Sequence, residues 1–322
     1  MTGCVVTGAN GFVGAAVVTR LQGTSHFAIR ATVRQVGQNF PPDVSVHSGL
    51  DLSAFTDWMP VLSDVECVIH TAGRVHVMHD IASGALHTYR ETNVVGTLNL
   101  ARQSAAAGVR RFVFISSIKV NGEGTAPQCQ FTPDDFPAPV DPYGISKREA
   151  EDALRQLATS TGMEVVILRP PLVYGPGVKA NFLSMMRWLN KGVPLPLGSI
   201  NNKRSFVAID NLVDLIITCI GHPVAANQTF LVSDGKDIST TQLLRLMGNA
   251  LGKPARLISV PVWMLEAGAA LLGRRDLSQR LCGNLQVDIS KAKDLLGWLP
   301  PVSVDEGLRV TAEHFLADLS KV

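Results

Sequence analysis

The sequence feature that most restricts the fold of this chain is a glycine-rich stretch near its amino terminus. Residues 5–14 read VVTGANGFVG, an apolar strand-like run followed by three glycines spaced three apart and the start of a helical pattern. In this context Gly8 permits a tight turn, Gly11 lets backbone approach a pyrophosphate at the helix amino terminus, and Gly14 lets helix and strand pack closely. The stretch therefore predicts a dinucleotide-binding turn between a first strand and a first helix.

Short apolar runs alternate with helical stretches through the first half of the chain. Strands are predicted at Cys4–Val6, Ala28–Val33, Val44–His47, Cys67–His70, Arg111–Ser116 and Val165–Leu168. Helices are predicted at Gly11–Gln22, Ser53–Leu62, Ala82–Ala107 and Tyr143–Thr161. Because the strands are rich in Val and Ile without polar alternation, they are typical of strands buried on both faces. We therefore expect an α/β fold, a Rossmann-type doubly wound parallel sheet.

The composition and the pattern of the sequence change after about Arg169. Proline and glycine become frequent over residues 170–177 and 192–198, and the strand–helix alternation becomes less regular. We therefore expect a dinucleotide-binding domain over residues 1–170. A smaller region over residues 171–322 should shape a cleft beside it, with some of its segments packing back on the first domain.

Composition excludes several other functional classes. Lys plus Arg total 29 and Asp plus Glu 27, a net charge of +2 without a clustered basic face, so no nucleic-acid partner is expected. The five cysteines are scattered and lack metal-ligand spacing, which predicts no metal site and favours a reducing cytoplasm. We see neither a signal peptide nor an apolar stretch long enough to cross a membrane.

The end of the second predicted strand bears on the choice of cofactor. A carboxylate there would bind the ribose hydroxyls of NAD, but no Asp or Glu occurs between Ala15 and Pro42. The strand ends instead at Arg34, whose planar guanidinium suits a 2′-phosphate. NADP(H) is therefore the preferred prediction, and NAD(H) stays possible.

A second group of residues predicts proton-transfer chemistry. Ser117 ends an apolar strand, and Tyr143 and Lys147 lie four residues apart, on one face of a predicted helix. A nearby ammonium favours the phenolate and would lower the pKa of Tyr143, so that the phenol could exchange a proton with an alcohol or ketone. Ser117 could hold the same oxygen.

Together these pieces resemble the extended short-chain dehydrogenase/reductase superfamily, in its nucleotide-sugar epimerase and reductase branch. Further landmarks of the resemblance are Asp51-Leu52, residues 70–73 (HTAG), residues 93–97 (NVVGT) and residues 169–177. The resemblance implies a catalytic trio of Ser117, Tyr143 and Lys147. It implies cofactor contacts at Gly8, Asn10, Gly11, Phe12, Val13, Arg34, Asp51, Leu52, Thr71, Ala72, Gly73, Asn93, Tyr143, Lys147 and Pro170.

The second half resembles the nucleotide-sugar region of that family. Asn181 matches a segment that contacts the substrate diphosphate, and Arg204 and Arg280 match arginines that grip it. The pairing is physically reasonable because guanidinium groups suit phosphate oxygens. The full set of expected substrate-binding residues is Arg74, His76, Ser117, Asn121, Asn181, Arg204 and Arg280.

Two departures from the family pattern guide the expected activity. Arg34 replaces the acid that family epimerases usually carry, and residues 119–122 read KVNG where Val-Tyr-Gly often occurs. With residues 74–78, these details look most like 4-reductases of UDP-4-keto-6-deoxy-N-acetylhexosamines. We therefore expect NADPH-dependent reduction at C4, in the synthesis of surface polysaccharide precursors.

Two alternatives stay open. An NAD-dependent nucleotide-sugar 4-epimerase, of the UDP-glucose or UDP-N-acetylglucosamine type, would use the same trio. A non-catalytic NADP(H)-binding sensor is disfavoured, because such relatives commonly lose the tyrosine or the lysine. The family resemblance also implies a UDP-sugar substrate and a homodimer formed through the helices at residues 82–107 and 143–161.

Overall fold

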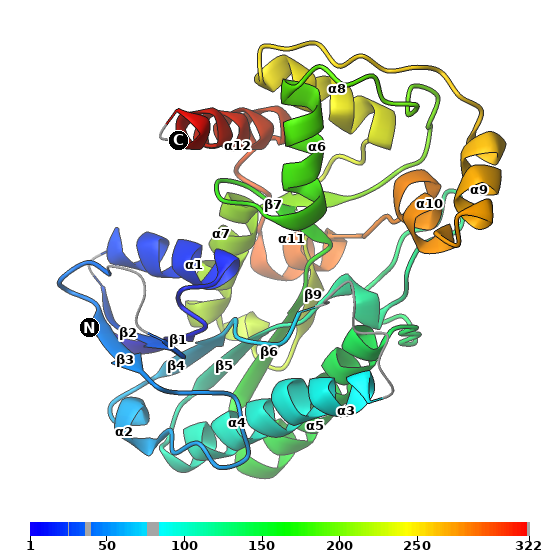
Figure 1. Ribbon diagram of the computed structural model, residues 1–322. Coiled ribbons are helices and arrows are strands. Elements are labelled where there is room, and N and C mark those ends of the chain that lie inside the picture. Colours follow the sequence, from blue (N-terminus) through cyan, green and yellow to red (C-terminus); the bar gives the residue numbers. More distant parts are fainter. Residues whose placement is uncertain (25, 36–39, 76–83, 321–322) are drawn as a thin grey trace.

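The computed structural model describes residues 1–24, 26–35, 40–75 and 84–320, apart from the side chains of residues 275–277 (Figure 1). At its centre lies a sheet of seven strands, and every neighbouring pair in it is parallel. The strands are, in order across the sheet, β3 (Ser45–Ser48), β2 (Phe27–Val33), β1 (Thr2–Thr7), β4 (Cys67–His70), β5 (Arg111–Ile115), β6 (Glu164–Arg169) and β9 (Thr229–Leu231). The predicted α/β fold class is confirmed.

The strand order reverses beside β1. The chain first moves outward through β2 and β3 and then returns to place β4 on the other side of β1. At such a reversal the loops that follow the two central strands diverge, which opens a crevice at their carboxyl ends. The glycine stretch follows β1, and the 70–73 motif follows β4, so the two motifs meet at this crevice.

Helices cover both faces of the sheet (Figure 1). Val6 faces α1 and α7, whereas Val5 faces α4 and α5, as expected when alternate residues of a strand point to opposite faces. The helices of the first face are α1 (Phe12–Gln22), α7 (Ile209–Gly221) and α11 (Ser290–Leu296). Those of the second face are α2 (Met59–Leu62), α4 (Thr97–Ala106) and α5 (Pro142–Thr161).

The helix predicted over Ala82–Ala107 is described from residue 84 onward and has three parts. They are α3 (Ala85–Arg90), a π-helical turn η1 (Glu91–Gly96) and α4. Gly96 ends the π turn against the backbone at Leu52, and a Cβ there would lie 2.6 Å from the Leu52 carbonyl carbon. The wider turn carries Asn93, in agreement with the tendency of π turns to occur at functional sites.

The helix predicted over Ser53–Leu62 is wrong for its first half. Only Met59–Leu62 forms a helix, as α2. The preceding residues bond to backbone through their side chains: Thr56 Oγ1 donates to the Asp51 carbonyl, and Asp57 Oδ1 accepts from the Met59 amide. Such local bonds offer the backbone an alternative to the helix.

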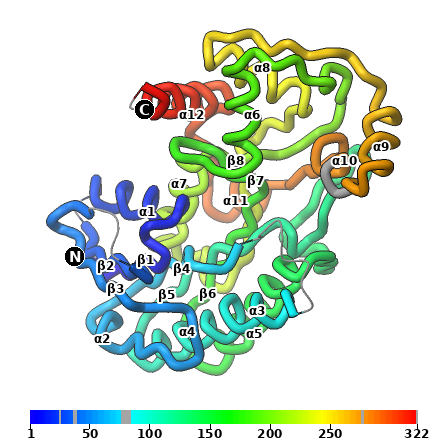
Figure 2. The backbone as a smooth tube through the Cα atoms, viewed as in Figure 1, coloured from blue at the N-terminus to red at the C-terminus, as the bar shows by residue number. Residues whose placement is uncertain are grey.

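Segments of the second half of the chain form a separate apolar core. The chain contributes to this core, returns to the main sheet and then contributes to the core again, as can be followed in Figure 2. That core contains a two-stranded parallel sheet of β7 (Leu172–Tyr174) and β8 (Phe206–Ala208), with helices α6 (Ala180–Asn190), α8 (Thr240–Ala250) and α12 (Val304–Leu319). Beside it lie α9 (Val262–Leu271) and α10 (Arg275–Cys282). The sequence analysis missed β9, which completes the main sheet from within this half.

Short 3₁₀ turns occur at η2 (Ile118–Val120) and η3 (Pro223–Ala225).

The described part of the chain lacks both a membrane-spanning helix and a metal-binding cluster. None of its helices combines the length and the apolar character needed to cross a bilayer. Within the same residues, His, Cys, Asp and Glu side chains form no group of three or more that could hold a metal ion.

Candidate active site

The glycine turn after β1 is packed so closely that side chains are excluded from it. Gly8 has a φ of 65° and its carbonyl accepts from the Gly11 amide at 2.8 Å. A Cβ on Gly14 would lie 2.2 Å from the Gly8 carbonyl oxygen, and one on Gly8 would lie 2.9 Å from the Ala72 Cα. Helix α1 begins without a side-chain cap and without an acidic residue in its first turn. The turn therefore fits a pyrophosphate held by backbone amides.

A second segment follows β4 and is fixed by Asn93. The buried Asn93 amide accepts from the Arg74 backbone nitrogen at 2.8 Å and donates to the Arg74 carbonyl at 3.0 Å. Thr71 Oγ1 anchors the segment to the Thr7 carbonyl at 2.5 Å. A Cβ on Gly73 would lie 3.5 Å from Lys147 Nζ. The segment thus brings Ala72 and Gly73 beside the glycine turn on one side and beside Lys147 on the other.

The other expected cofactor residues lie at strand ends on the same edge of the sheet. Arg34 follows β2 and is exposed. Asp51, also exposed, follows β3 and accepts from the Leu52 amide at 2.9 Å. Pro170 is buried directly after β6. These positions share the carboxyl edge of the sheet with the glycine turn, the edge at which a ligand binds in such folds.

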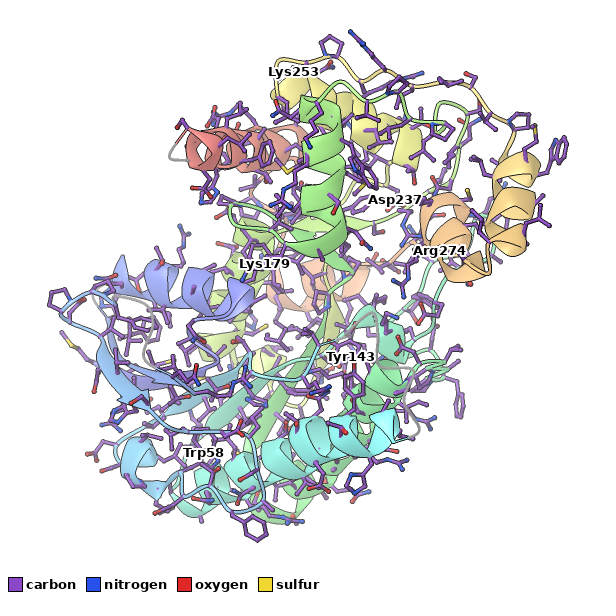
Figure 3. All side chains as sticks on the ribbon, viewed as in Figure 1. Trp58, Tyr143, Lys179, Asp237, Lys253 and Arg274 are labelled. Atoms are coloured by element: carbon purple, nitrogen blue, oxygen red, sulfur yellow. The ribbon has the colours of Figure 1, made fainter. Side chains whose placement is uncertain are left out.

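Ser117, Tyr143 and Lys147 come together at the start of α5. Tyr143 is half-buried and lies between the sheet and the upper group of helices (Figure 3). Burial raises the pKa of Tyr143 to about 12, while a hydrogen bond with Ser117 acts to lower it. Lys147 is 5% exposed, and burial lowers its pKa to about 8. A hydroxyl, a phenol and an amine in one buried place can exchange protons with a bound alcohol or ketone.

The expected effect of Lys147 on Tyr143 is not observed. The Lys147 ammonium donates to the Ile115 carbonyl at 2.9 Å and lies 4.4 Å from the centre of the Phe114 ring. The charges that act on the Tyr143 phenol are those of Asp141 and Tyr89, both of which raise its pKa. The prediction of a lowered pKa is therefore wrong for the protein by itself, because burial outweighs the hydrogen bond from Ser117.

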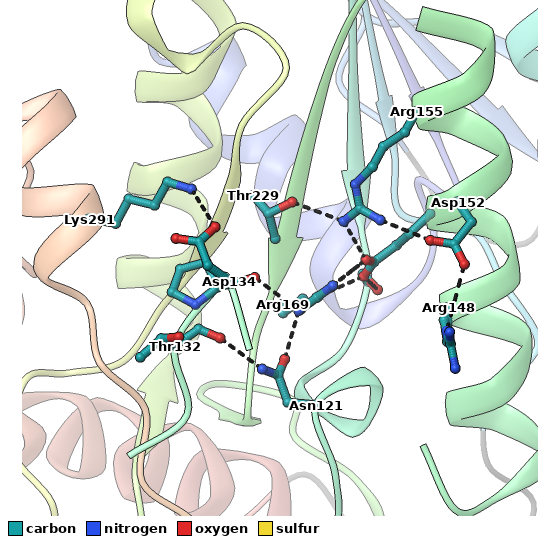
Figure 4. A network of polar contacts seen from close by, with 12 residues as sticks. Asn121, Thr132, Asp134, Arg148, Asp152, Arg155, Arg169, Thr229 and Lys291 are labelled. Carbon is teal, nitrogen blue, oxygen red and sulfur yellow. Dashed lines mark hydrogen bonds and ion pairs between the residues drawn. The ribbon is translucent and has the colours of Figure 1, made fainter. Parts of the chain in front are cut away.

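The sequence analysis missed a buried ion pair of Arg169, which belongs to the polar network in Figure 4. Arg169 and Glu151 are 2% and 0% exposed and form a bidentate pair, with one N–O distance of 2.6 Å. Ser116 donates to the same carboxylate at 2.6 Å. The spacing of Lys147 and Glu151 places a carboxylate on the helical face of the trio, but no local pattern points to Arg169 as its partner.

Asn121, expected to bind substrate, belongs to this same network. Its amide nitrogen donates to the Thr132 carbonyl at 2.8 Å, and its oxygen accepts from Arg169 at 2.9 Å. The side chain is 2% exposed. The structure thus places Asn121 among buried protein partners.

The expected diphosphate residues lie on the second half of the chain. Arg204 donates to the Gly283 carbonyl at 3.1 Å. Burial lowers the pKa of Arg204, the charge of Glu123 raises it, and the charge of Arg280 lowers it. Arg204 and Arg280 are therefore close enough to repel each other. Asn181 is exposed in the first turn of α6.

Arg74 and His76, the two remaining residues that are expected to bind substrate, come after β4 in the sequence. The Arg74 guanidinium lies 5.6 Å from the centre of the Tyr89 ring, which in turn packs edge-on against Tyr143 at 6.1 Å. Arg74 therefore approaches the trio through Tyr89. His76 lies outside the described residues.

An open cleft of about 900 Å³ adjoins the glycine turn. Its walls come from both halves of the chain, and include Asn10, Gly11, Phe12, Pro176, Gly177 and Lys179. Lys179, labelled in Figure 3, immediately precedes α6. Sequence reasoning did not single it out, because an isolated lysine in a loop carries no signal of its own.

Comparison with known proteins identifies the family of the chain. Residues 4–233 match the NAD dependent epimerase/dehydratase family. The chain belongs to that family. The epimerase/dehydratase family is one of NAD(P)-binding enzymes, so the expectations of an enzyme and of a pyridine-nucleotide cofactor are confirmed at this level.

Two curated relatives within this family are informative. A UDP-glucose 4-epimerase of Vibrio cholerae is 50% identical over 318 residues, which cover 97% of this chain and 95% of the relative. A UDP-glucose 4-epimerase of Mycolicibacterium smegmatis is 28% identical over 333 residues, covering 97% of both chains.

Solved structures of the family share the whole fold. A UDP-glucuronic acid 4-epimerase from Bacillus cereus in complex with NAD gives a TM-score of 0.80 at 20% identity, covering 98% of this chain and 99% of its own. A UDP-glucose 4-epimerase from Thermotoga maritima with UDP-glucose gives 0.79 at 23% identity, covering 99% and 100%. At these identities the likeness concerns the fold alone.

The expectation of a 4-ketosugar reductase is wrong. The relative at 50% identity, matched over nearly its full length, is a UDP-glucose 4-epimerase, which favours the alternative. The error arose because Ser117, Tyr143 and Lys147 serve both chemistries. Arg34 and the KVNG segment therefore do not identify a reductase in this chain.

Proposed function

We propose that this protein is a UDP-sugar 4-epimerase of the UDP-glucose type. The observation that carries the proposal is the 50% identity to a UDP-glucose 4-epimerase over 97% of this chain. The trio at the start of α5 supports it, because epimerisation at C4 needs a group that removes a proton from the C4 hydroxyl and later returns it. Tyr143 is that group in our proposal.

The cofactor supplies a hydride acceptor and donor at C4 when it is bound. The backbone amides of Gly11, Phe12 and Val13 hold its pyrophosphate at the start of α1, where the helix dipole favours negative charge. Asp51 binds at the adenine end, while Ala72 and Gly73 line its path. Lys147 holds the nicotinamide ribose.

Three side chains handle the proton and the sugar oxygen. Ser117 holds the C4 oxygen through both half-reactions. Tyr143 accepts its proton as the hydride leaves and returns the proton once the ketosugar has turned over. The burial of Lys147 and the partial burial of Tyr143 limit the access of water to this exchange, which strengthens each electrostatic contact that they make.

Residues of the second half bind the UDP moiety in this proposal. Arg204 and Arg280 repel each other, and a diphosphate between them would relieve that repulsion. Asn181 contacts the same diphosphate from the first turn of α6. Binding energy from this remote group orients the sugar at Tyr143.

We propose NAD as the working cofactor, held through each catalytic cycle. An epimerase needs no net oxidant, because the hydride that leaves the sugar returns to it. Arg34 bears on the alternative, since it could pair with the 2′-phosphate of NADP. Extraction of the purified protein should release NAD, and an extract that contains NADP alone would overturn this part of the proposal.

We further propose a homodimer that pairs the helical region of α3 and α4 with α5. Sedimentation measurements over a range of concentrations test this. A single species with the mass of one chain at micromolar concentration would contradict it.

The proposed activity is tested with purified protein and UDP-glucose in the absence of added cofactor. UDP-galactose should form until equilibrium is reached, and UDP-galactose should be converted in reverse. The parallel arm offers UDP-N-acetylglucosamine, which tests the alternative epimerase substrate. The absence of any UDP-sugar interconversion by NAD-loaded protein would overturn the proposal.

A further inference from the structure

The η2 turn, which follows Ser117, is joined through its backbone to the start of α5. The Lys119 amide donates to Ser117 Oγ at 3.3 Å. The Val120 carbonyl accepts from the Ala138 amide at 3.1 Å, just before α5. Gly144 approaches this turn so closely that a Cβ on it would lie 2.9 Å from the Lys119 carbonyl oxygen. The main chain of Lys119 therefore contacts both segments that carry Ser117 and Tyr143.

The side chain of Lys119 connects two carboxylates across the same junction. Its ammonium pairs with Glu123 at 2.8 Å and with Asp141. The three side chains are only 22%, 25% and 18% exposed. Ion pairs shielded from solvent to this degree are screened less than those at an open surface.

Asp141 uses its two oxygens for different purposes. Oδ1 accepts from the Gly144 amide at 2.6 Å and so caps α5, while Oδ2 pairs with Lys119. The carboxylate lies two residues before Tyr143, and its negative charge raises the pKa of the phenol. The Asp141 carboxylate, which caps α5, thus destabilises the phenolate form of Tyr143.

Neither the other groups that act on the Tyr143 phenol nor those near Lys147 remove this effect. Tyr89, from α3, also raises the pKa of the phenol, and it carries the Arg74 guanidinium on its ring. His70, at the end of β4, has its pKa lowered to about 3 and is neutral. Lys147 donates to the Ile115 carbonyl. Lys119, which also pairs with Glu123, is a cation that contacts Asp141 directly.

We propose that Lys119 is a positioning residue, whose ammonium neutralises Asp141 beside the Tyr143 phenol and fixes the Ser117 turn against the start of α5. The inference rests on the proposed role of Tyr143 as the proton-exchanging group. It explains why a lysine at this position suits the site: the ammonium offsets part of the charge with which the helix-capping aspartate opposes ionisation of the neighbouring phenol. Glu123 holds the lysine in that orientation.

The first test measures the pH dependence of kcat/KM for UDP-glucose. Lys119→Met removes the charge, so the pH of half-maximal activity on the acidic side should rise by about half a unit to one unit. Asp141→Asn keeps a good helix cap but removes the negative charge, so the same pH should fall. The double variant should lie near the wild type. A uniform loss of activity in Lys119→Met, without any displacement of the profile, would overturn the proposal.

The second test needs no catalysis. The chain has three tyrosines, so the difference in phenolate absorbance between a protein and its Tyr143→Phe form isolates Tyr143 during a pH titration. In NAD-loaded protein, Lys119→Met should displace this titration to higher pH and Asp141→Asn to lower pH. If Lys119→Met fails to fold, Asp141→Asn alone tests the proposal. A Tyr143 titration at the same pH as in the wild type would then contradict it.

A matched control is Lys236→Met. It removes a lysine that pairs with an aspartate, Asp305, at the surface, where the side chains are 64% and 63% exposed. Neither the pH profile nor the titration should move. A titration that responds to Lys119 in a protein without epimerase activity would refute the proposed function and leave this inference standing. Activity with an unmoved titration would refute the inference alone.

Discussion

Lys147 and Tyr143 lie one turn apart on α5, yet the Lys147 ammonium donates to the carbonyl of Ile115 in the neighbouring strand and not to the phenol. Lys147 is thereby fixed from the sheet, with its pKa lowered to about 8, while the pKa of Tyr143 is raised to about 12 by burial. The helix spacing brings the two groups to one face, but it does not make them partners. The ionisation of the phenol therefore depends on what else lies near it, including the cofactor and the neighbours of Asp141.

Tyr143→Phe removes the proton-exchanging group and leaves the ring in place. Epimerisation should fall by about 10²- to 10⁴-fold, the usual contribution of a general acid–base group. The amount of NAD released on extraction should stay at the level of the wild type. Unchanged turnover would remove the tyrosine from the mechanism.

Gly14→Ala tests the packing of the glycine turn. The new methyl group would lie 2.2 Å from the Gly8 carbonyl oxygen and 2.7 Å from Thr71 Oγ1, so the turn must shift. We expect a loss of stability of about 1–3 kcal/mol and a marked loss of bound NAD. The control is Gly268→Ala in α9, where nothing lies within 4 Å, which should be neutral or stabilising. Equal cofactor content in both variants would contradict the close packing of the turn.

Glu151→Ala leaves the Arg169 guanidinium buried without its carboxylate. Unfolding in urea should show a loss of about 3–5 kcal/mol, as is usual when one partner of a buried pair is removed. Arg309→Met serves as the control, because Arg309 pairs with Glu306 and Glu313 at an exposed surface of α12 and its loss should leave the unfolding midpoint nearly unchanged. Similar losses in both variants would contradict the importance of burial.

His70 should make the free energy of unfolding decrease as the pH falls into the acidic range. Its ring bonds to Thr7 and Thr97 and is fully buried, and burial, followed by the charge of Lys147, lowers its pKa from 6.5 to about 3. Below pH 6.5 the unfolded chain binds a proton that the folded protein does not. Stability from this group is therefore complete above pH 6.5 and falls by roughly 4–5 kcal/mol as the pH approaches 3. Denaturant unfolding at several pH values should show a smaller acid slope for His70→Gln, and an unchanged slope would refute the assignment.

Arg204→Ala tests the proposed diphosphate contact. A charge-assisted hydrogen bond contributes about 1.5–3 kcal/mol, so KM for UDP-glucose should rise by at least about 10-fold with a smaller change in kcat. The control is Arg245→Ala, an exposed arginine on α8, which should behave as the wild type. A defect confined to kcat would be inconsistent with a role in substrate binding.

Much of the site was visible in the sequence because its residues follow strands. The glycine turn, the segment at residues 70–73 and Ser117 each end an apolar run, and parallel strands bring their carboxyl ends to one edge. Asn121 shows the limit of this reasoning. The family resemblance places Asn121 among the substrate-binding residues, whereas its amide bonds to Thr132 and Arg169 inside the protein.

The sequence by itself determined the α/β fold, the dinucleotide turn and the placement of Tyr143 and Lys147 on one helical face, because each follows from local spacing and from the limited conformations of the backbone. Only the tertiary structure decided which charges surround those groups. Arg169 meets Glu151, Lys119 meets Asp141, and β9 completes the sheet from the far half of the chain. Such contacts join residues 18, 22 and 60 or more positions apart. Packing the helices and strands fixes which of these partners meet, and no local pattern records it.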